Sequence, residues 1–315
     1  PIAPSETISK AKKGLRHKLA VWIRMNLFIP DARVGWFPFA YLAAAEYHKT
    51  NPIDIVLSFG PPHSTHLAPL LLNAFHSIPF VPLFIDPWMD IIYYKEFKRS
   101  SFTLFLDGWL EKTVLRKASY SVFVTETMTR DYLDKYKEIQ GKTAVIHWGY
   151  NERAFEGTET LDIQRGTMLH SGNIFDYQDP TPLWIYMEKR KQSGSPLKIK
   201  FSGTVSPQVK KSITRHGLDD DVTYLGFLPY GEMIREMMAV EFLLVCVTEP
   251  RHVPGKLFEY LRSGRPILCF GENNQEVASI LKEQKAGEIF RYDENPENFF
   301  LNSELYVQNR QTIDR

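Results

Sequence analysis

The sequence predicts an α/β protein built on parallel sheets, and three observations support this. Short runs rich in Val, Ile, Leu and Phe alternate with longer helical segments along most of the chain. This alternation is typical of parallel sheets with helical crossovers. Most of the runs are apolar throughout, as expected for strands covered on both faces. The 315 residues are also enough for two domains with separate cores.

Ten strands are predicted. Four lie in the first half, at Ile53–Phe59, Phe80–Ile85, Tyr120–Val124 and Ala144–Ile146. Six lie in the second half, at Met168–Ser171, Leu197–Ser202, Val222–Gly226, Val240–Val247, Pro266–Phe270 and Glu288–Arg291. Helices are predicted at Thr65–Phe75, Phe102–Lys117, Thr127–Tyr136, Pro182–Lys191, Pro207–His216, Gly231–Met238, Gly255–Ser263 and Gln275–Lys285, after a basic helical start.

A polar segment without clear periodicity, Asn151–Ile163, marks the expected domain boundary. We place the first domain at residues 1–157 and the second at 158–315. The second domain has enough strands for a complete doubly wound sheet. The first lacks the strand and glycine-rich turn that normally open such a domain, so we expect it to be incomplete, with its first strands upstream.

Composition narrows the class of protein. A hydrophobic content of 43% and an aromatic content of 13% are typical of a globular chain. The net charge of +1 gives no bulk attraction to nucleic acid, so no nucleic-acid partner is expected. Cys246 and Cys269 lie inside apolar runs and are expected to be buried thiols of a reducing, cytoplasmic compartment. No apolar run reaches the roughly 18 residues of a membrane span.

The first residues are basic and amphipathic. Lysines and arginines alternate with apolar residues such as Leu19, Trp22 and Ile23. A helix of this kind can lie on an anionic membrane surface, which would make the protein peripheral on the inner face of the membrane. The alternative is a solvated helix that packs Trp22 inward.

The segment Glu249–Phe270 is the most informative part of the chain. Pro254 and Gly255 open a short helix in which Lys256 and Glu259, three residues apart, share one face. A helix N-terminus and a lysine attract phosphate, and a carboxylate accepts hydroxyl protons, so this pattern indicates a nucleotide. Arg251 could add charge at the phosphates. The alternative is an i,i+3 salt bridge on a solvated helix.

Ligands of open α/β sheets bind beyond the carboxyl ends of the strands. Gly172 and Asn173 follow one predicted strand and Gly203 and Thr204 follow the next, where glycine would let the backbone approach a phosphate. Leu228 follows the third, in a loop whose backbone could meet a nucleobase edge. Plain loops are the alternative at each place.

Two residues of the first half are candidate catalytic groups. His66 follows the strand Ile53–Phe59, with Ser64 as the expected helix cap, and could donate to a substrate hydroxyl or act as a base. Asp86 follows the next strand and could orient a hydroxyl or act as a general base. Their alternatives are a capping or surface histidine and a turn-forming aspartate before Pro87.

The sequence lacks the motifs of several kinds of catalytic and binding site. The sequence contains no Walker A pattern, no G-x-G-x-x-G after a strand and no G-x-S-x-G elbow. No Cys/His cluster has zinc spacing and no D-x-D triplet is present, so we expect no metal site.

Taken together, these segments resemble a retaining glycosyltransferase of the GT-B fold, in the family 4 group that builds bacterial surface polysaccharides and glycolipids. The resemblance covers about Leu19 to Tyr292. It is carried by IPDARVGW, IDIVLSFGPPHSTH, IDPWMD, VIHWGYNERAF, HSGNIF, VTYLGFLPYGEM and, most specifically, VPGKLFEYLRSGRPIL.

The resemblance implies two Rossmann-like domains facing a cleft. Glu259 would bind the ribose of a nucleotide-sugar and Lys256 its diphosphate, approached by Gly172 and Asn173. His66 would contact the transferred sugar. The donor would be a substrate, no cofactor or metal would be needed, and the acceptor would be a lipid-linked compound or a glycan.

The sequence departs from this family at Arg251, where the first glutamate of an E-x7-E motif often stands, and at Ile85, where related sequences usually have arginine. The N-terminal glycine-rich loop is absent. Two alternatives therefore stay open: a nucleotide-sugar epimerase on the same fold and a non-catalytic nucleotide-sugar-binding subunit.

Overall fold

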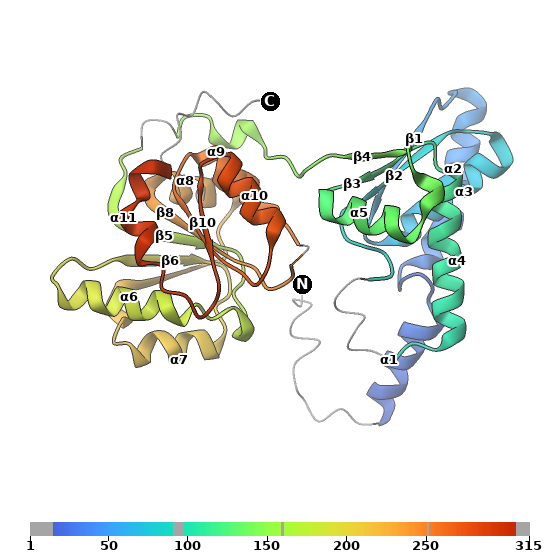
Figure 1. The fold of residues 1–315 in the computed structure, drawn as a ribbon. Helices are drawn as coiled ribbons and strands as arrows, with labels where there is room; N and C mark the ends of the chain where they lie inside the picture. The colour runs from blue at the N-terminus through green and yellow to red at the C-terminus, as the bar shows by residue number, and fades with distance from the viewer. Residues whose placement is uncertain (1–14, 91–97, 159–160, 251, 307–315) are drawn as a thin grey trace. The chain divides into compact units, whose positions relative to one another are not determined.

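The computed structural model describes residues 15–90, 98–158, 161–250 and 252–306. The chain divides into two compact units, residues 1–147 and 148–315, and each contains one parallel sheet (Figure 1). The division falls ahead of the polar segment Asn151–Ile163. Within that segment the short helix η5 (Glu152–Phe155) buries Phe155 in the core of the second unit.

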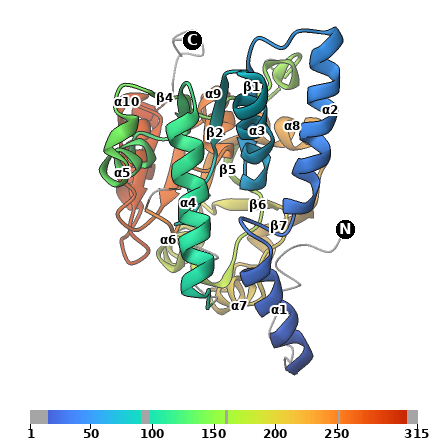
Figure 2. The ribbon, with the colours of Figure 1, turned by 90° about the vertical axis from the view of Figure 1, so that its right-hand side faces the viewer.

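The four strands predicted in the first unit are present. They are β1 (Val56–Gly60), β2 (Phe80–Phe84), β3 (Ser121–Phe123) and β4 (Thr143–Val145), paired in parallel in that order. The helices are α1 (Leu15–Leu27), α2 (Phe37–Thr50), α3 (Leu67–His76), α4 (Ser101–Lys117) and α5 (Glu126–Lys135). Figure 2 shows α2 and α3 side by side, as their contacts confirm. The sequence did not predict α2.

The core of the first unit includes a buried polar network on α4. Asp107 and Glu111, one turn apart, are both fully buried. Asp107 accepts a hydrogen bond from the indole of Trp88 at 2.7 Å and pairs with Arg99. Glu111 accepts hydrogen bonds from Tyr132 at 2.8 Å and from Lys135 at 2.7 Å. Trp88 is therefore a core residue.

The helix α1 is fastened to the start of α4 by Asn26. Its side-chain oxygen accepts from the Ser100 amide at 2.6 Å and its nitrogen donates to the Lys98 carbonyl at 3.3 Å. Trp22 lies one turn earlier and is 49% exposed, so the expected alternative of a tryptophan packed inward is wrong. None of the helices in the described residues is long and apolar enough to cross a membrane.

The second unit contains all six predicted strands. They are β5 (Gln164–Ser171), β6 (Lys198–Ser202), β7 (Val222–Gly226), β8 (Val240–Cys246), β9 (Ile267–Phe270) and β10 (Gly287–Phe290). The helices are α6 (Thr181–Gln192), α7 (Pro207–Arg215), α8 (Tyr230–Ala239), α9 (Lys256–Ser263), α10 (Gln275–Glu283) and α11 (Glu297–Leu301). Two apolar clusters cover the sheet: α6, α7 and α11 pack on one face, and α8, α9 and α10 pack on the other.

The strand order of this sheet is β10-β9-β8-β5-β6-β7. The chain runs outward from β5 to β7 and then returns to the other side of β5 with β8. This reversal creates a switch point between β5 and β8, where ligands of doubly wound sheets bind. Cys246 and Cys269 are free, buried thiols on the neighbouring strands β8 and β9, as predicted.

Candidate functional site

Two glycines bring the loops after β5 and β6 into backbone contact. Gly172 has a φ of +96° and Gly203 a φ of +128°, values that L side chains rarely adopt. The amide of Gly172 donates to the Ser202 carbonyl at 2.6 Å. A Cβ on Gly203 would lie 2.4 Å from the Gly172 oxygen, so only glycine fits there.

The residues that follow these glycines tie the two loops together. The side-chain oxygen of Asn173 accepts from the Thr204 amide at 3.0 Å, and the Ile174 amide donates to the Thr204 carbonyl at 2.9 Å. Asn173 and Thr204 are both exposed. The sequence-predicted residues of these two loops thus form one joined rim at the carboxyl edge of the sheet.

The helix α9 brings Lys256 to the same rim. Gly255 is the N-cap, one position before the first helical residue. The helix ends at Gly264 in the left-handed conformation, and Leu257 and Leu261 are buried, both as predicted. The Nζ of Lys256 donates to the Ser171 carbonyl at 2.7 Å. A Cβ on Gly172 would lie 3.6 Å from this Nζ, so the lysine and the glycine loop meet at the end of β5.

The surroundings of Lys256 lower the pKa of its ammonium group. Burial lowers the pKa of Lys256 to about 8. Its Nζ also lies 3.4 Å from Nε2 of His170, whose own pKa burial holds well below its usual value. Nδ1 of this histidine lies 3.0 Å from the Leu244 carbonyl, which requires a proton on Nδ1 and leaves Nε2 as an acceptor toward the lysine. A bound anion would stabilise the charged lysine.

Glu259 does not pair with Lys256. No ion pair joins the two among the residues that the structure describes, so the alternative of a salt bridge on a solvated helix does not hold. Instead, the Tyr230 hydroxyl donates to Oε1 of Glu259 at 2.9 Å. Burial raises the pKa of Glu259, and burial and then Glu259 raise the pKa of Tyr230 to about 12.

The sequence analysis missed several residues that support the site. Tyr260 is fully buried, accepts from the Ser171 amide at 2.8 Å and donates to the Ser171 hydroxyl at 3.0 Å, which fixes the end of β5. His170 and Tyr230 hold Lys256 and Glu259. The sequence showed that His170 lies in a predicted strand and that Tyr230 follows one, but not which side chains they would contact.

The remaining predicted residues of the second unit lie around the same edge. Leu228 is partly buried in the loop between β7 and α8, next to Phe227, which is 94% exposed. Gly255 faces the ring of Trp148, which lies 3.9 Å from where its Cβ would be. Arg251 lies outside the described residues.

The structure places His66 in the interior of the first unit. Its ring is fully buried, with Nδ1 2.8 Å from the Ser58 hydroxyl, and burial holds its pKa well below the usual value. The contact of His66 with a sugar stays a prediction. Ser64 does not cap α3. Its amide and its hydroxyl both donate hydrogen bonds to the Asp31 carboxylate, at 2.8 Å and 3.0 Å.

Asp86 follows β2 as predicted and is partly buried. It lies directly before Pro87 and the buried Trp88. Asp86 thus lies at the carboxyl edge of the first sheet. This position is compatible with a turn-forming role and with a role toward a substrate hydroxyl.

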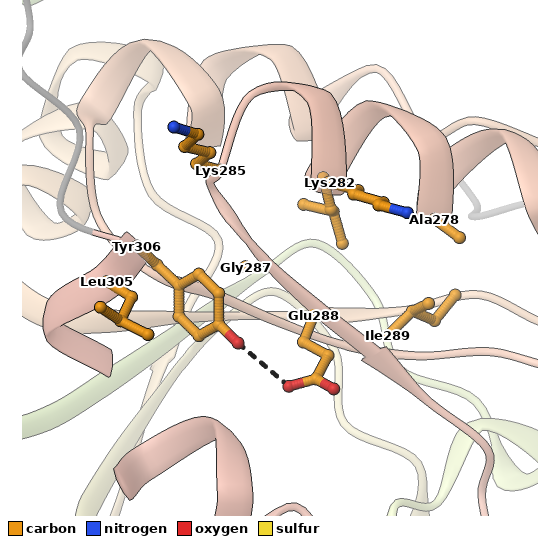
Figure 3. Close-up of a pocket in the computed structure, with 9 residues that line it drawn as sticks. Ala278, Lys282, Lys285, Gly287, Glu288, Ile289, Leu305 and Tyr306 are labelled. Atoms are coloured by element: carbon orange, nitrogen blue, oxygen red, sulfur yellow. Dashed lines mark hydrogen bonds between the residues drawn. The ribbon is translucent and has the colours of Figure 1, made fainter. Parts of the chain in front are cut away.

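A surface pocket lies elsewhere in the second unit. It has a volume of about 440 Å³ and lies between α10, β10 and η8 (Ser303–Tyr306), where Tyr306 donates to Glu288 at 3.1 Å (Figure 3). None of the binding or catalytic residues predicted from the sequence lines this pocket. Among the described residues, no group of three or more His, Cys, Asp and Glu side chains could hold a metal ion.

No protein-family model matches the sequence, and no curated protein matches it either. Solved structures are similar in fold. HepE of Anabaena in complex with UDP has a TM-score of 0.63 at 15% identity, over 89% of this chain and 77% of HepE. Sucrose-phosphate synthase from Thermosynechococcus elongatus has a TM-score of 0.58 at 16% identity, over 88% and 70% of the two chains.

An epimerase is similar as well. A UDP-N-acetylglucosamine 2-epimerase has a TM-score of 0.52 at 15% identity, over 89% of this chain and 72% of the epimerase. At such identities the likeness shows the fold alone. The chain therefore has the two Rossmann-like α/β units of the GT-B fold, which these similar proteins share.

Proposed function

We propose that the chain belongs to a glycosyltransferase that moves a sugar from a nucleotide-sugar to a hydroxyl of a lipid-linked or glycan acceptor. The observation that carries this proposal is the position of Lys256 at the switch point between β5 and β8. There its ammonium is held by the Ser171 carbonyl and lies beside Gly172, with Glu259 one turn further along α9. A cation next to a glycine loop suits a diphosphate, and a carboxylate suits a vicinal diol.

The reaction would need no nucleophile from the protein. The acceptor oxygen would form a bond to the anomeric carbon while the bond from that carbon to the diphosphate breaks. The acceptor proton would pass to a phosphate oxygen of the donor. Lys256 and the N-terminus of α9 would stabilise the departing diphosphate, which makes the reaction metal-independent. Retention of configuration and membership of family 4 are part of the proposal and rest on the sequence resemblance.

Nucleotide binding is tested by thermal denaturation of the full-length protein with UDP-, GDP- and dTDP-sugars. One nucleotide class should raise the melting temperature, because a ligand that binds only the folded state stabilises it. Glu259→Ala should abolish the shift, whereas Glu283→Ala, an exposed glutamate at the end of α10, should keep it. A shift that survives Glu259→Ala would overturn the assignment of Glu259 to the ribose.

Turnover assays separate sugar transfer from its two alternatives. A transferase releases nucleoside diphosphate only when an acceptor is present. An epimerase, which the similar epimerase structure favours, would alter the sugar without an acceptor. A non-catalytic subunit would bind the nucleotide and turn nothing over. Added EDTA should leave the transfer rate unchanged, and a complete loss would contradict the metal-independent mechanism.

The place of action is part of the same proposal. A lipid-linked acceptor would be reached from the cytoplasmic face of a membrane, with the basic helix α1 toward anionic lipid. Arg16, Lys18 and Arg24 are exposed on this helix. Sedimentation of the protein with vesicles that contain an anionic lipid, compared with neutral vesicles, tests this expectation, and equal binding to both would contradict it.

A further inference from the structure

Tyr230 and Glu259 come together from two different elements. Tyr230 is the first residue of α8, directly after the loop that follows β7, and Glu259 lies in the first turn of α9. The tyrosine hydroxyl donates to Oε1 of the glutamate at 2.9 Å. The contact therefore joins the two helix starts at the carboxyl edge of the sheet.

The tyrosine hydroxyl also lies near the backbone of Asn151. The backbone amide of Asn151 interacts with it and lowers the pKa of Tyr230, against the larger effect of burial. A phenolic oxygen can accept one hydrogen bond while it donates another. Tyr230 is 42% exposed, so the ring remains at the surface of the site and is not part of the core.

The contact leaves most of the carboxylate available. An ionised carboxylate has about four lone-pair positions on its two oxygens. Tyr230 occupies one of them on Oε1, and among the described residues no other hydrogen bond to Glu259 is found. The remaining positions suit two hydroxyl donors side by side, and the tyrosine fixes the plane in which they are presented.

We propose that Tyr230 is a positioning residue that holds the Glu259 carboxylate ready for the two ribose hydroxyls and so makes the site select nucleotides with an intact 2′,3′-diol. This inference rests on the proposed function. Without Tyr230 the carboxylate is free to turn toward Lys256 on the same helix face and form the i,i+3 pair that is absent here. In that ion pair, the Lys256 ammonium and the Glu259 carboxylate would bind each other and would no longer be available to the nucleotide.

The test measures the dissociation constants of UDP and 2′,3′-dideoxy-UDP by calorimetry on the full chain. Tyr230→Phe should weaken UDP binding about fivefold to tenfold, which corresponds to the loss of one ordinary hydrogen bond, because the ribose contacts of Glu259 are weakened and not removed. It should change the affinity for the dideoxy compound less than about twofold. A structural role would weaken both ligands equally.

Tyr224→Phe is the matched control. Tyr224 lies on β7, is 45% exposed, and stacks on Phe201 with Nζ of Lys210 4.6 Å from its ring centroid. Its hydroxyl has no hydrogen bond within the described part of the chain, so the variant should bind both nucleotides like the wild type.

The outcomes separate this inference from the function beneath it. A selective loss of UDP affinity in Tyr230→Phe supports the inference. An equal loss for both nucleotides, or no loss, overturns it while UDP binding by the wild type leaves the proposed function standing. A wild type that binds neither nucleotide, and that GDP and dTDP do not stabilise either, overturns both.

Discussion

At the scale of single residues, Lys256 is the group of the candidate site whose altered pKa bears most directly on ligand binding. It is partly buried, hydrogen-bonded to a carbonyl and close to a neutral imidazole, and its pKa is lowered to about 8. A diphosphate would favour the charged form and raise this pKa again. Binding of the proposed ligand is therefore coupled to uptake of a proton.

This coupling predicts a pH dependence. Below the pKa of about 8 the free protein already carries the charge, and above it each binding event must first protonate the lysine. The affinity for UDP should fall about tenfold between pH 7 and pH 9, as measured by calorimetry. Lys256→Met should bind weakly with a flat profile, and Lys282→Met, on the exposed side of α10, should keep the fall. A fall that persists in Lys256→Met would assign the effect to another group.

Position in sequence predicted some residues better than others. That Lys256 and Glu259 share one helix face follows from periodicity alone, because they lie three positions apart on a short helix with a glycine at each end. His66 was correctly placed at a strand end, but its burial depends on the rings of Phe84 and Trp88, which pack against it from another segment. No local pattern contains that information.

At the scale of elements, the contact between the loops after β5 and β6 shapes the site. Gly203→Ala should destabilise the second unit, because it strains a φ of +128° and drives a methyl group to 2.4 Å from the Gly172 oxygen. We expect a loss of about 2–3 kcal/mol in the free energy of unfolding, measured with denaturant. Gly231→Ala in α8, where a Cβ meets no atom within 4 Å, should be neutral. Equal stability of the two variants would contradict this account of the loop.

The elements themselves were largely predictable. All ten strands were found. The clearest were β8 and β9, which are buried on both faces and are therefore continuous apolar runs bounded by turn residues. The helix α2 was missed for a physical reason: none of its residues is buried, so its apolar side chains Phe39 and Leu42 follow no single inward face. The partners of Glu259 and Lys256 were not predictable, since they arise from the strand order that places β5 beside β8.

At the scale of the whole molecule, the two units have separate cores and should respond separately to substitution. Glu111→Ala removes the acceptor for Tyr132, Tyr136 and Lys135 in the first unit. Breaking such a buried charged network costs about 3–5 kcal/mol. Hydrogen exchange should therefore speed up in β2, β3 and α5 and stay unchanged in the second unit.

The matched control for this substitution is Glu138→Ala. Glu138 forms an exposed ion pair with Lys112 at 3.3 Å, and such surface pairs contribute at most about 1 kcal/mol. Its exchange pattern should resemble that of the wild type. Faster exchange throughout both units in Glu111→Ala would show that the cores are coupled.

The amine of Lys256 also has a consequence for covalent chemistry. With a pKa of about 8, roughly a tenth of its molecules carry a free lone pair at pH 7, compared with fewer than about one in a thousand for an ordinary lysine. Acylating reagents attack only that form, so this side chain becomes the preferred target for them among lysines of equal access. A bound nucleotide would shield the amine and favour its protonated form. The rate of acylation at Lys256 would therefore fall when the site is occupied, and this rate can be used to measure occupancy.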